Sequence, residues 1–328
     1  MKNNHKTFFL SLLAILLICL LLTHPQDSLT LSLTGLQLWM NKMIPSLLPF
    51  MILSGIMIRL QLTGHFVKLL SPVLTPLLRI DPNGIYVVVM GFLCGFPMGA
   101  KVIADLYTSS KLSRKEASFL LSFCNSIGPV YFISFVLPTL GLSLRLPYLL
   151  GMYALPFCYG LILRYTLYRS AFAYSIHPRL PAHQLGKILS AAQSTTRISL
   201  LDAVDDSILS GLYSIARLGG YMILFNILNL IPLVFLPNSS GNNPGPAAVA
   251  GCFLEITAGI SRIGSSSPLL ILLILPFGGL SCIAQTYSMI KDTDLSLQHY
   301  ILHKLVLTGL TALYYLLWSL FAPSTFLL

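Results

Sequence analysis

Three polar side chains stand within or beside long apolar stretches of the sequence. Lys101 follows the stretch 85–100, Asn125 lies beside a glycine and a proline, and Glu255 interrupts the stretch 247–260. An ammonium group can bind an anion, an amide can bind a polar group, and a carboxylate in an apolar segment usually has a function such as gating or ion coupling. Together these residue types predict a site for a small anionic or polar solute.

Each of the three residues also has a purely structural interpretation. Lys101 could extend its ammonium group to a membrane surface, and Asn125 could join two helices by hydrogen bonds. Glu255 could pair with Arg262 or Arg217, since a buried carboxylate is costly without a partner. The sequence alone leaves these alternatives open.

Glycine and proline interrupt two apolar segments near these side chains, at 85–100 and at 269–290. A helix that stops at membrane depth must line protein or a water-filled cavity, and its free N–H groups suit a carboxylate or a phosphate. We therefore expect two re-entrant hairpins, with an ordinary proline-kinked span as the alternative for the first. The interrupting residues are Gly95, Pro97 and Gly99 in the first segment and Pro276, Gly278 and Gly279 in the second.

The elements that position these residues follow from composition. Of the 328 residues, 55% are hydrophobic and only 9% are charged, whereas a soluble domain has about 25% charged residues. This composition excludes soluble enzymes, nucleic-acid binders and secreted disulfide scaffolds. It predicts an all-α polytopic membrane protein with about eight membrane segments.

The two interrupted segments also resemble each other. Residues 95–113 align with 279–296 after one gap, and both end in a Leu-Ser pair that begins an apolar helix. Lys101 then lies opposite Gln285. Many transporters are built from inverted repeats, and we predict one here.

Motifs for catalysis or metal binding do not occur in the sequence. It contains no nucleophile elbow, phosphate loop or HExxH motif, so we expect neither an enzyme nor a cofactor. His299 and His303 have the i, i+4 spacing of a metal site, but no third ligand is near. We expect them at the membrane interface beside Lys304, with no metal.

One long run resembles a known family. GFPMGAKVIADLYTSSKLSRKEASFLLSFCNSIGPVYFI, from Gly95, is similar to sporulation integral membrane proteins of the YlbJ type. These carry the nucleoside-recognition or gate domain and are related in design to concentrative nucleoside transporters. Three shorter runs agree and extend the resemblance from about residue 36 to 320, whereas SRIGSSSP after Glu255 matches no family motif. The three runs are DDSILSGLYSIARLGGYMILFNIL, GCFLEITAGI and GGLSCIAQTYSMI.

The resemblance implies an endospore-forming bacterium and a permease that moves dipicolinate, an aromatic dicarboxylate, across the outer forespore membrane. It divides the chain into an N-terminal anchor span at 1–35, a first gate-like membrane repeat at 36–170, a cytoplasmic amphipathic linker at 171–206 and a second gate-like repeat at 207–328. Nucleic acid is not an expected partner. A homo-oligomer or other sporulation membrane proteins could be.

We therefore predict a multi-pass permease for a small anionic solute, dipicolinate. A nucleoside-type transporter and a non-transporting scaffold of a sporulation membrane complex are the alternatives. The predicted solute contacts are Gly95, Pro97, Gly99, Lys101, Asn125, Glu255, Gly279 and Gln285.

Overall fold

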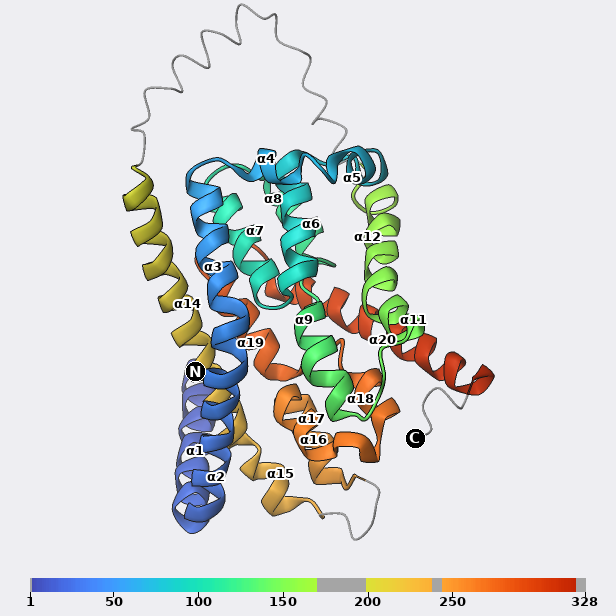
Figure 1. Cartoon of the computed structure of the whole chain (residues 1–328). Helices are drawn as coiled ribbons and strands as arrows, with labels where there is room; N and C mark the ends of the chain where they lie inside the picture. The colour runs from blue at the N-terminus through green and yellow to red at the C-terminus, as the bar shows by residue number, and fades with distance from the viewer. Residues whose placement is uncertain (1, 170–198, 238–243, 323–328) are drawn as a thin grey trace, which may run out of the picture.

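The computed structural model describes residues 2–169, 199–237 and 244–322, and these residues form helices and connecting loops (Figure 1). Most of the predicted linker 171–206 lies outside the described residues. Its last residues, from Leu200, belong to a long helix that continues into the next apolar segment. The first half contains α1 Lys2–Thr23, α2 Pro25–Leu38, α3 Ile44–Arg59, α4 Thr63–Val67, α5 Ser71–Leu78, α6 Pro82–Cys94, α7 Met98–Thr108, α8 Arg114–Leu121, α9 Pro129–Tyr131, α10 Leu137–Thr139, α11 Leu146–Leu149 and α12 Leu155–Tyr165.

The second half likewise combines long helices with short ones. Its helices are α14 Leu200–Leu228, α15 Leu230–Phe235, α16 Pro246–Leu254, α17 Ile256–Ile263, α18 Pro268–Ile274, α19 Gly279–Ile290 and α20 Leu297–Phe321.

Several helices could cross a membrane. Within the described residues, five are long and apolar enough, and a pair bent by 104°, α5 with α6, would make a sixth. The predicted number of about eight segments included two re-entrant hairpins, whereas these five or six are spanning helices only. The five are Pro25–Arg59, Leu146–Tyr165, Leu200–Phe235, Pro268–Ile290 and Leu297–Phe321.

The N-terminal boundary differs from the prediction. The second helix begins at Pro25, where proline is tolerated because the first N–H groups of a helix have no partner within the helix. It continues past residue 35, through a π-helical turn at Trp39–Met43, into α3. The Trp39 indole N–H donates to the backbone oxygen of Ile215 at 2.8 Å, which fixes this long helix against α14.

Two pairs of short helices fold back on themselves. Hairpin 1 consists of α6 and α7 and lies at the first predicted position. Hairpin 2 consists of α16 and α17, whereas the second predicted position, 269–290, is an interrupted helix, α18 and α19, and not a hairpin. Figure 1 shows hairpin 1 in the upper half of the molecule and hairpin 2 in the lower half. Their turns lie near mid-height, beside the places where two other helices are interrupted.

These two interruptions, together with the hairpins, position the residues at the centre of the molecule. Break 1, residues 122–128, separates α8 from α9, and break 2, residues 275–278, separates α18 from α19. Two helices, α8 before break 1 and α20 after α19, start at the serines that the sequence indicated. Ser113 and Glu116 form the predicted capping box of α8, and the Ser296 hydroxyl accepts the His299 N–H at the start of α20.

Candidate functional site

Hairpin 1 is joined to break 1 by backbone contacts. The Phe96 N–H donates to the backbone oxygen of Ser126 at 2.7 Å. Gly95 has φ +76°, and a Cβ there would lie only 2.2 Å from the Gly128 nitrogen; a Cβ on Gly99 would meet a backbone oxygen of break 1 at 2.3 Å. Both glycines therefore serve a close approach of two backbones. Pro97 precedes the first residue of α7 and so ends the turn.

Hairpin 2 is held at its turn by a carboxylate. Glu255 separates α16 from α17, and its oxygens accept the N–H groups of Thr257 at 3.2 Å and Ala258 at 2.7 Å. The side chain thus caps α17. Gly279, at the end of break 2, has φ +80°, and a Cβ there would lie 3.1 Å from the Leu254 oxygen. Break 2 therefore packs directly on the turn of hairpin 2.

Glu255 forms no direct ion pair with either arginine considered as its structural partner. Among the described residues, no Lys, Arg or His side chain lies within 4.0 Å of its carboxylate. Arg262 of α17 nevertheless interacts with the Glu255 charge, and its Nη1 would lie 3.5 Å from a Cβ on Gly251 of α16. Arg217 instead donates to the Ser288 oxygen at 2.9 Å.

Asn125 in break 1 connects both halves of the chain. Its Oδ1 accepts the Ala100 N–H at 3.3 Å, and its Nδ2 donates to the Thr286 hydroxyl at 2.9 Å and the Tyr300 hydroxyl at 3.0 Å. These bonds tie break 1 to α7, α19 and α20. The geometry is that of the helix-to-helix hydrogen bonds considered as an alternative from the sequence.

Lys304 of α20 reaches the same place. Its Nζ donates to the backbone oxygen of Asn125 at 2.8 Å and lies 5.1 Å from the centre of the Phe96 ring. The side chain is only 4% exposed, and no ion pair of Lys304 occurs among the described residues. The expectation that this part of α20 lies at a membrane interface stays a prediction. Sequence reasoning missed Lys304 as a site residue, although Tyr300, Lys304 and Thr311 recur along one side of the helix.

Lys101, the cation chosen from the sequence, is neutralised elsewhere. Its Nζ lies 3.1 Å from the Asp105 carboxylate and donates to the Ser210 hydroxyl at 3.2 Å, between α7 and α14. Gln285, its predicted counterpart, donates to the Ser281 hydroxyl at 2.9 Å within α19. Both side chains are buried. Neither has a hydrogen bond to the break loops within the described part of the chain.

The two histidines of α20 bond to tyrosines. Their ring centres are 4.9 Å apart, and the His303 Nδ1 lies 2.6 Å from the Tyr159 hydroxyl. Tyr168 approaches the His299 Nδ1 at 3.5 Å. In the described residues no three His, Cys, Asp or Glu side chains gather as metal ligands would.

Comparison with known proteins finds one family model and one sporulation protein to which this sequence is similar. Residues 40–142 match the family model Gate, described as nucleoside recognition. The sporulation integral membrane protein YlbJ of Bacillus subtilis (strain 168) is 29% identical, over 92% of this chain and 78% of that protein. This chain is a homologue of that sporulation protein and carries a Gate domain. It is accordingly a multi-pass integral membrane protein. No solved structure matches it significantly.

The Gate domain supplies one of the two hairpins and one of the two breaks. Its matched residues run from the π-helical turn before α3 to the end of α10, so they include hairpin 1 and break 1. Hairpin 2, break 2 and Lys304 come from the chain beyond it. The two parts meet where Phe96, in the turn of hairpin 1, would be 3.5 Å from a Cβ on Gly278 of break 2.

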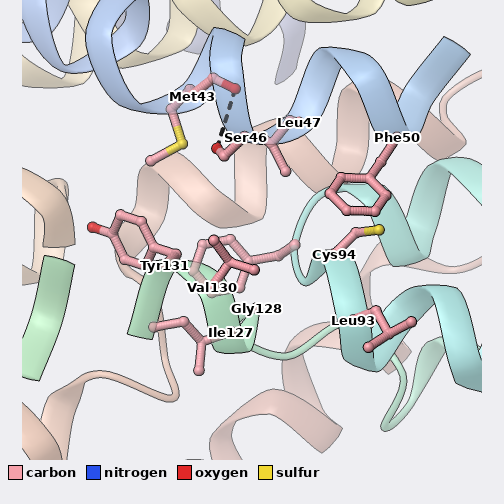
Figure 2. Close-up of a pocket in the computed structure, with 11 residues that line it drawn as sticks. Met43, Ser46, Leu47, Phe50, Leu93, Cys94, Ile127, Gly128, Val130 and Tyr131 are labelled. Atoms are coloured by element: carbon pink, nitrogen blue, oxygen red, sulfur yellow. Dashed lines mark hydrogen bonds between the residues drawn. The ribbon is translucent and has the colours of Figure 1, made fainter. Parts of the chain in front are cut away.

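An apolar pocket opens beside the Gate domain's hairpin. It lies between α3, the turn of hairpin 1 and α9; the cavity itself has a volume of about 30 Å³, and the open space at its mouth brings the total to about 450 Å³. Figure 2 shows Phe50, Leu93, Ile127 and Tyr131 around it, with Ser46 turned back to bond the Met43 oxygen of its own helix. Phe96 also lines this pocket. The same aromatic ring therefore faces an apolar pocket and approaches the Lys304 ammonium group.

Proposed function

We propose that the protein is a transporter of a small anionic solute, bound where the two hairpin turns and the two breaks meet. The observation that carries this proposal is the buried Lys304 ammonium group, which has no carboxylate partner among the described residues. A lone buried cation is costly, so it is typical of a binding site that an anion completes. Membership of a Gate-domain family, whose members are generally transporters, supports the same function.

The order of the elements supports an inverted repeat. Each half has a long helix, a hairpin, an interrupted segment and a final helix, and Figure 1 places the two hairpins at opposite ends of the molecule. In this register hairpin 1 corresponds to hairpin 2, and break 1 to break 2. The register differs from the alignment of 95–113 with 279–296, which sets the second arm of a hairpin against the helix after a break. Such repeats are typical of alternating-access transporters.

An aromatic carboxylate fits this environment better than a nucleoside does. Phe96 and the apolar pocket could hold a planar ring, while Lys304 could bind a carboxylate. A neutral nucleoside would need free hydrogen-bonding groups for its ribose, but the Asn125 amide already bonds to Ala100, Thr286 and Tyr300. We therefore propose dipicolinate as the solute and the outer forespore membrane as the location, in keeping with the sporulation role in the relative's name.

We also propose that Glu255 acts in gating or coupling. Its carboxylate holds the turn of hairpin 2 without a direct ion pair in the described chain, so a change of its charge would act directly on that turn. The glycines and Pro97 then shape the two turns, while Lys101 and Gln285 support α7 and α19. Asn125 fixes break 1 beside the solute.

Spore dipicolinate content distinguishes a transporter from a scaffold. A Bacillus subtilis strain lacking the relative would be complemented with this protein, with Lys304→Met, or with Lys115→Met, an exposed lysine at the start of α8. We expect Lys304→Met to yield spores with little dipicolinate at unchanged membrane abundance, and Lys115→Met to behave as the wild type. Normal content with Lys304→Met would favour the scaffold.

A further inference from the structure

A small cavity lies where both breaks meet α20. Its lining includes Ser126 of break 1, Pro276 of break 2, and Lys304 and Thr311 of α20, together with Gly151 from the π-helical turn before α12. The space is enough for about one water-sized group. It is too small for a whole aromatic solute but suits one small polar group.

Thr311 presents a hydroxyl that lacks a partner. The side chain is 0% exposed, and among the described residues its Oγ1 has no hydrogen bond. Buried hydroxyl groups nearly always have one. Thr308, on the preceding turn of the same helix, bonds its hydroxyl to the Lys304 oxygen at 2.7 Å. An unpaired hydroxyl on a cavity wall therefore points to a partner that enters the cavity.

The polar groups around the cavity can donate hydrogen bonds. An ammonium group has three N–H donors, and Lys304 uses one of them on the Asn125 oxygen. Thr311 adds a free O–H, and Ser126 a hydroxyl whose bond to the Phe123 oxygen is long, at 3.4 Å. The cavity lining contains no Asp or Glu. Donors next to a positive charge suit an anion and would repel a cation.

We propose that this cavity binds one anionic group, held by the Lys304 ammonium group and the Thr311 hydroxyl. The inference rests on the proposed function insofar as that group is a carboxylate of the transported solute. A small inorganic anion such as chloride has the same chemistry. Ile127 lines both this cavity and the apolar pocket of Figure 2, so the two spaces lie next to the same residue of break 1.

Binding to the full-length protein in nanodiscs tests the proposal. Dipicolinate and chloride would be titrated separately, with sodium gluconate maintaining ionic strength, for the wild type, Thr311→Val and the control Thr308→Val. A hydrogen bond to a charged group accounts for roughly a tenfold change in affinity or more. We expect Thr311→Val to weaken dipicolinate binding by about that factor. Its unfolding temperature should stay equal or rise, because an unpaired hydroxyl is replaced by a methyl group.

The outcomes separate this proposal from the proposed function. Unchanged dipicolinate affinity in Thr311→Val, with a wild type that carries dipicolinate into liposomes, would overturn the cavity and leave the transport function standing. Binding of chloride but not of dipicolinate to the wild type, with chloride binding lost in Thr311→Val, would support the anion site and overturn dipicolinate as the solute. Absence of any effect of either anion would overturn the cavity. An equal loss in Thr308→Val would also overturn it, because that hydroxyl does not line the cavity.

Discussion

Hairpin 1 and hairpin 2 reach the centre of the molecule in different ways. Hairpin 1 is joined to break 1 by a backbone hydrogen bond from Phe96, and Gly95 and Gly99 leave no room for a Cβ atom. Hairpin 2 has Glu255 at its turn, and a single side-chain hydrogen bond, from Tyr131 to Thr257 at 3.1 Å, joins its turn to α9. The turn of hairpin 2 also packs on break 2, but less tightly, since a Cβ on Gly279 would lie 3.1 Å from the Leu254 oxygen. The first hairpin is therefore fixed by the tighter backbone packing, and the second by looser packing together with polar side chains.

This difference indicates which hairpin is easier to displace. Separating hairpin 1 from break 1 would leave tightly packed backbone groups without partners at a depth where water is scarce. Moving the turn of hairpin 2 requires a change in one hydrogen bond, in the surroundings of one carboxylate and in the looser packing on Gly279. We infer that hairpin 2 is the more movable of the two.

Filling the contact of hairpin 1 should have the largest effect. Gly95→Ala adds a Cβ 2.2 Å from a backbone nitrogen at a positive φ, so we expect it to cost about 3 kcal/mol or more. The matched control is Gly220→Ala in α14, where nothing lies within 4 Å of an added Cβ. Membrane abundance and thermal unfolding of the two variants measure the effect. Equal stability of both would show that hairpin 1 is not held by close packing.

Removing the charge from hairpin 2 should affect transport more than stability. We expect Glu255→Gln to lower uptake about tenfold and to cost about 1–2 kcal/mol, because the amide oxygen can accept only one of the two N–H groups that the carboxylate caps. Glu116→Gln is the control, since Glu116 is also buried and belongs to the capping box of α8. It should lose less stability, because one oxygen of Glu116 accepts the single Ser113 N–H, and it should keep its uptake. If both variants transported equally well, Glu255 would be a cap only.

Loss of the link between α9 and hairpin 2 should have the smallest effect. Tyr131→Phe removes the hydrogen bond to Thr257, which should cost about 1 kcal/mol. Hydrogen exchange should become faster in α16 and α17 and remain unchanged in α6 and α7. Faster exchange in hairpin 1 as well would contradict the independence of the two hairpins.

Much of the local structure could be predicted from the sequence. Glycine and proline at 95–99 indicated the turn of hairpin 1, because a Gly-Phe-Pro-x-Gly run cannot remain a regular helix. The capping box of Ser113 and Glu116 depends on residues three apart, so it was readable too. The Leu-Ser pairs similarly indicated the starts of α8 and α20.

The site could not be predicted to the same extent, because it depends on contacts between distant segments. The pair of Lys101 with Asp105, four residues later in α7, could have been recognised from the sequence. The contact of Lys304 with the Asn125 oxygen could not, because it joins two distant segments. Glu255 finds its partners in its own helix, which a search for opposite charges overlooks. The repeat alignment was misled by short identities that do not follow the order of hairpins and breaks.

Uptake of labelled dipicolinate by liposomes containing the purified protein tests the central claim most directly. We expect wild-type protein and Lys115→Met to accumulate dipicolinate, an excess of uridine not to compete, and Lys304→Met to lose nearly all uptake. Equal uptake by Lys304→Met, or none by a folded wild type, would contradict an anionic solute bound at the centre of the molecule.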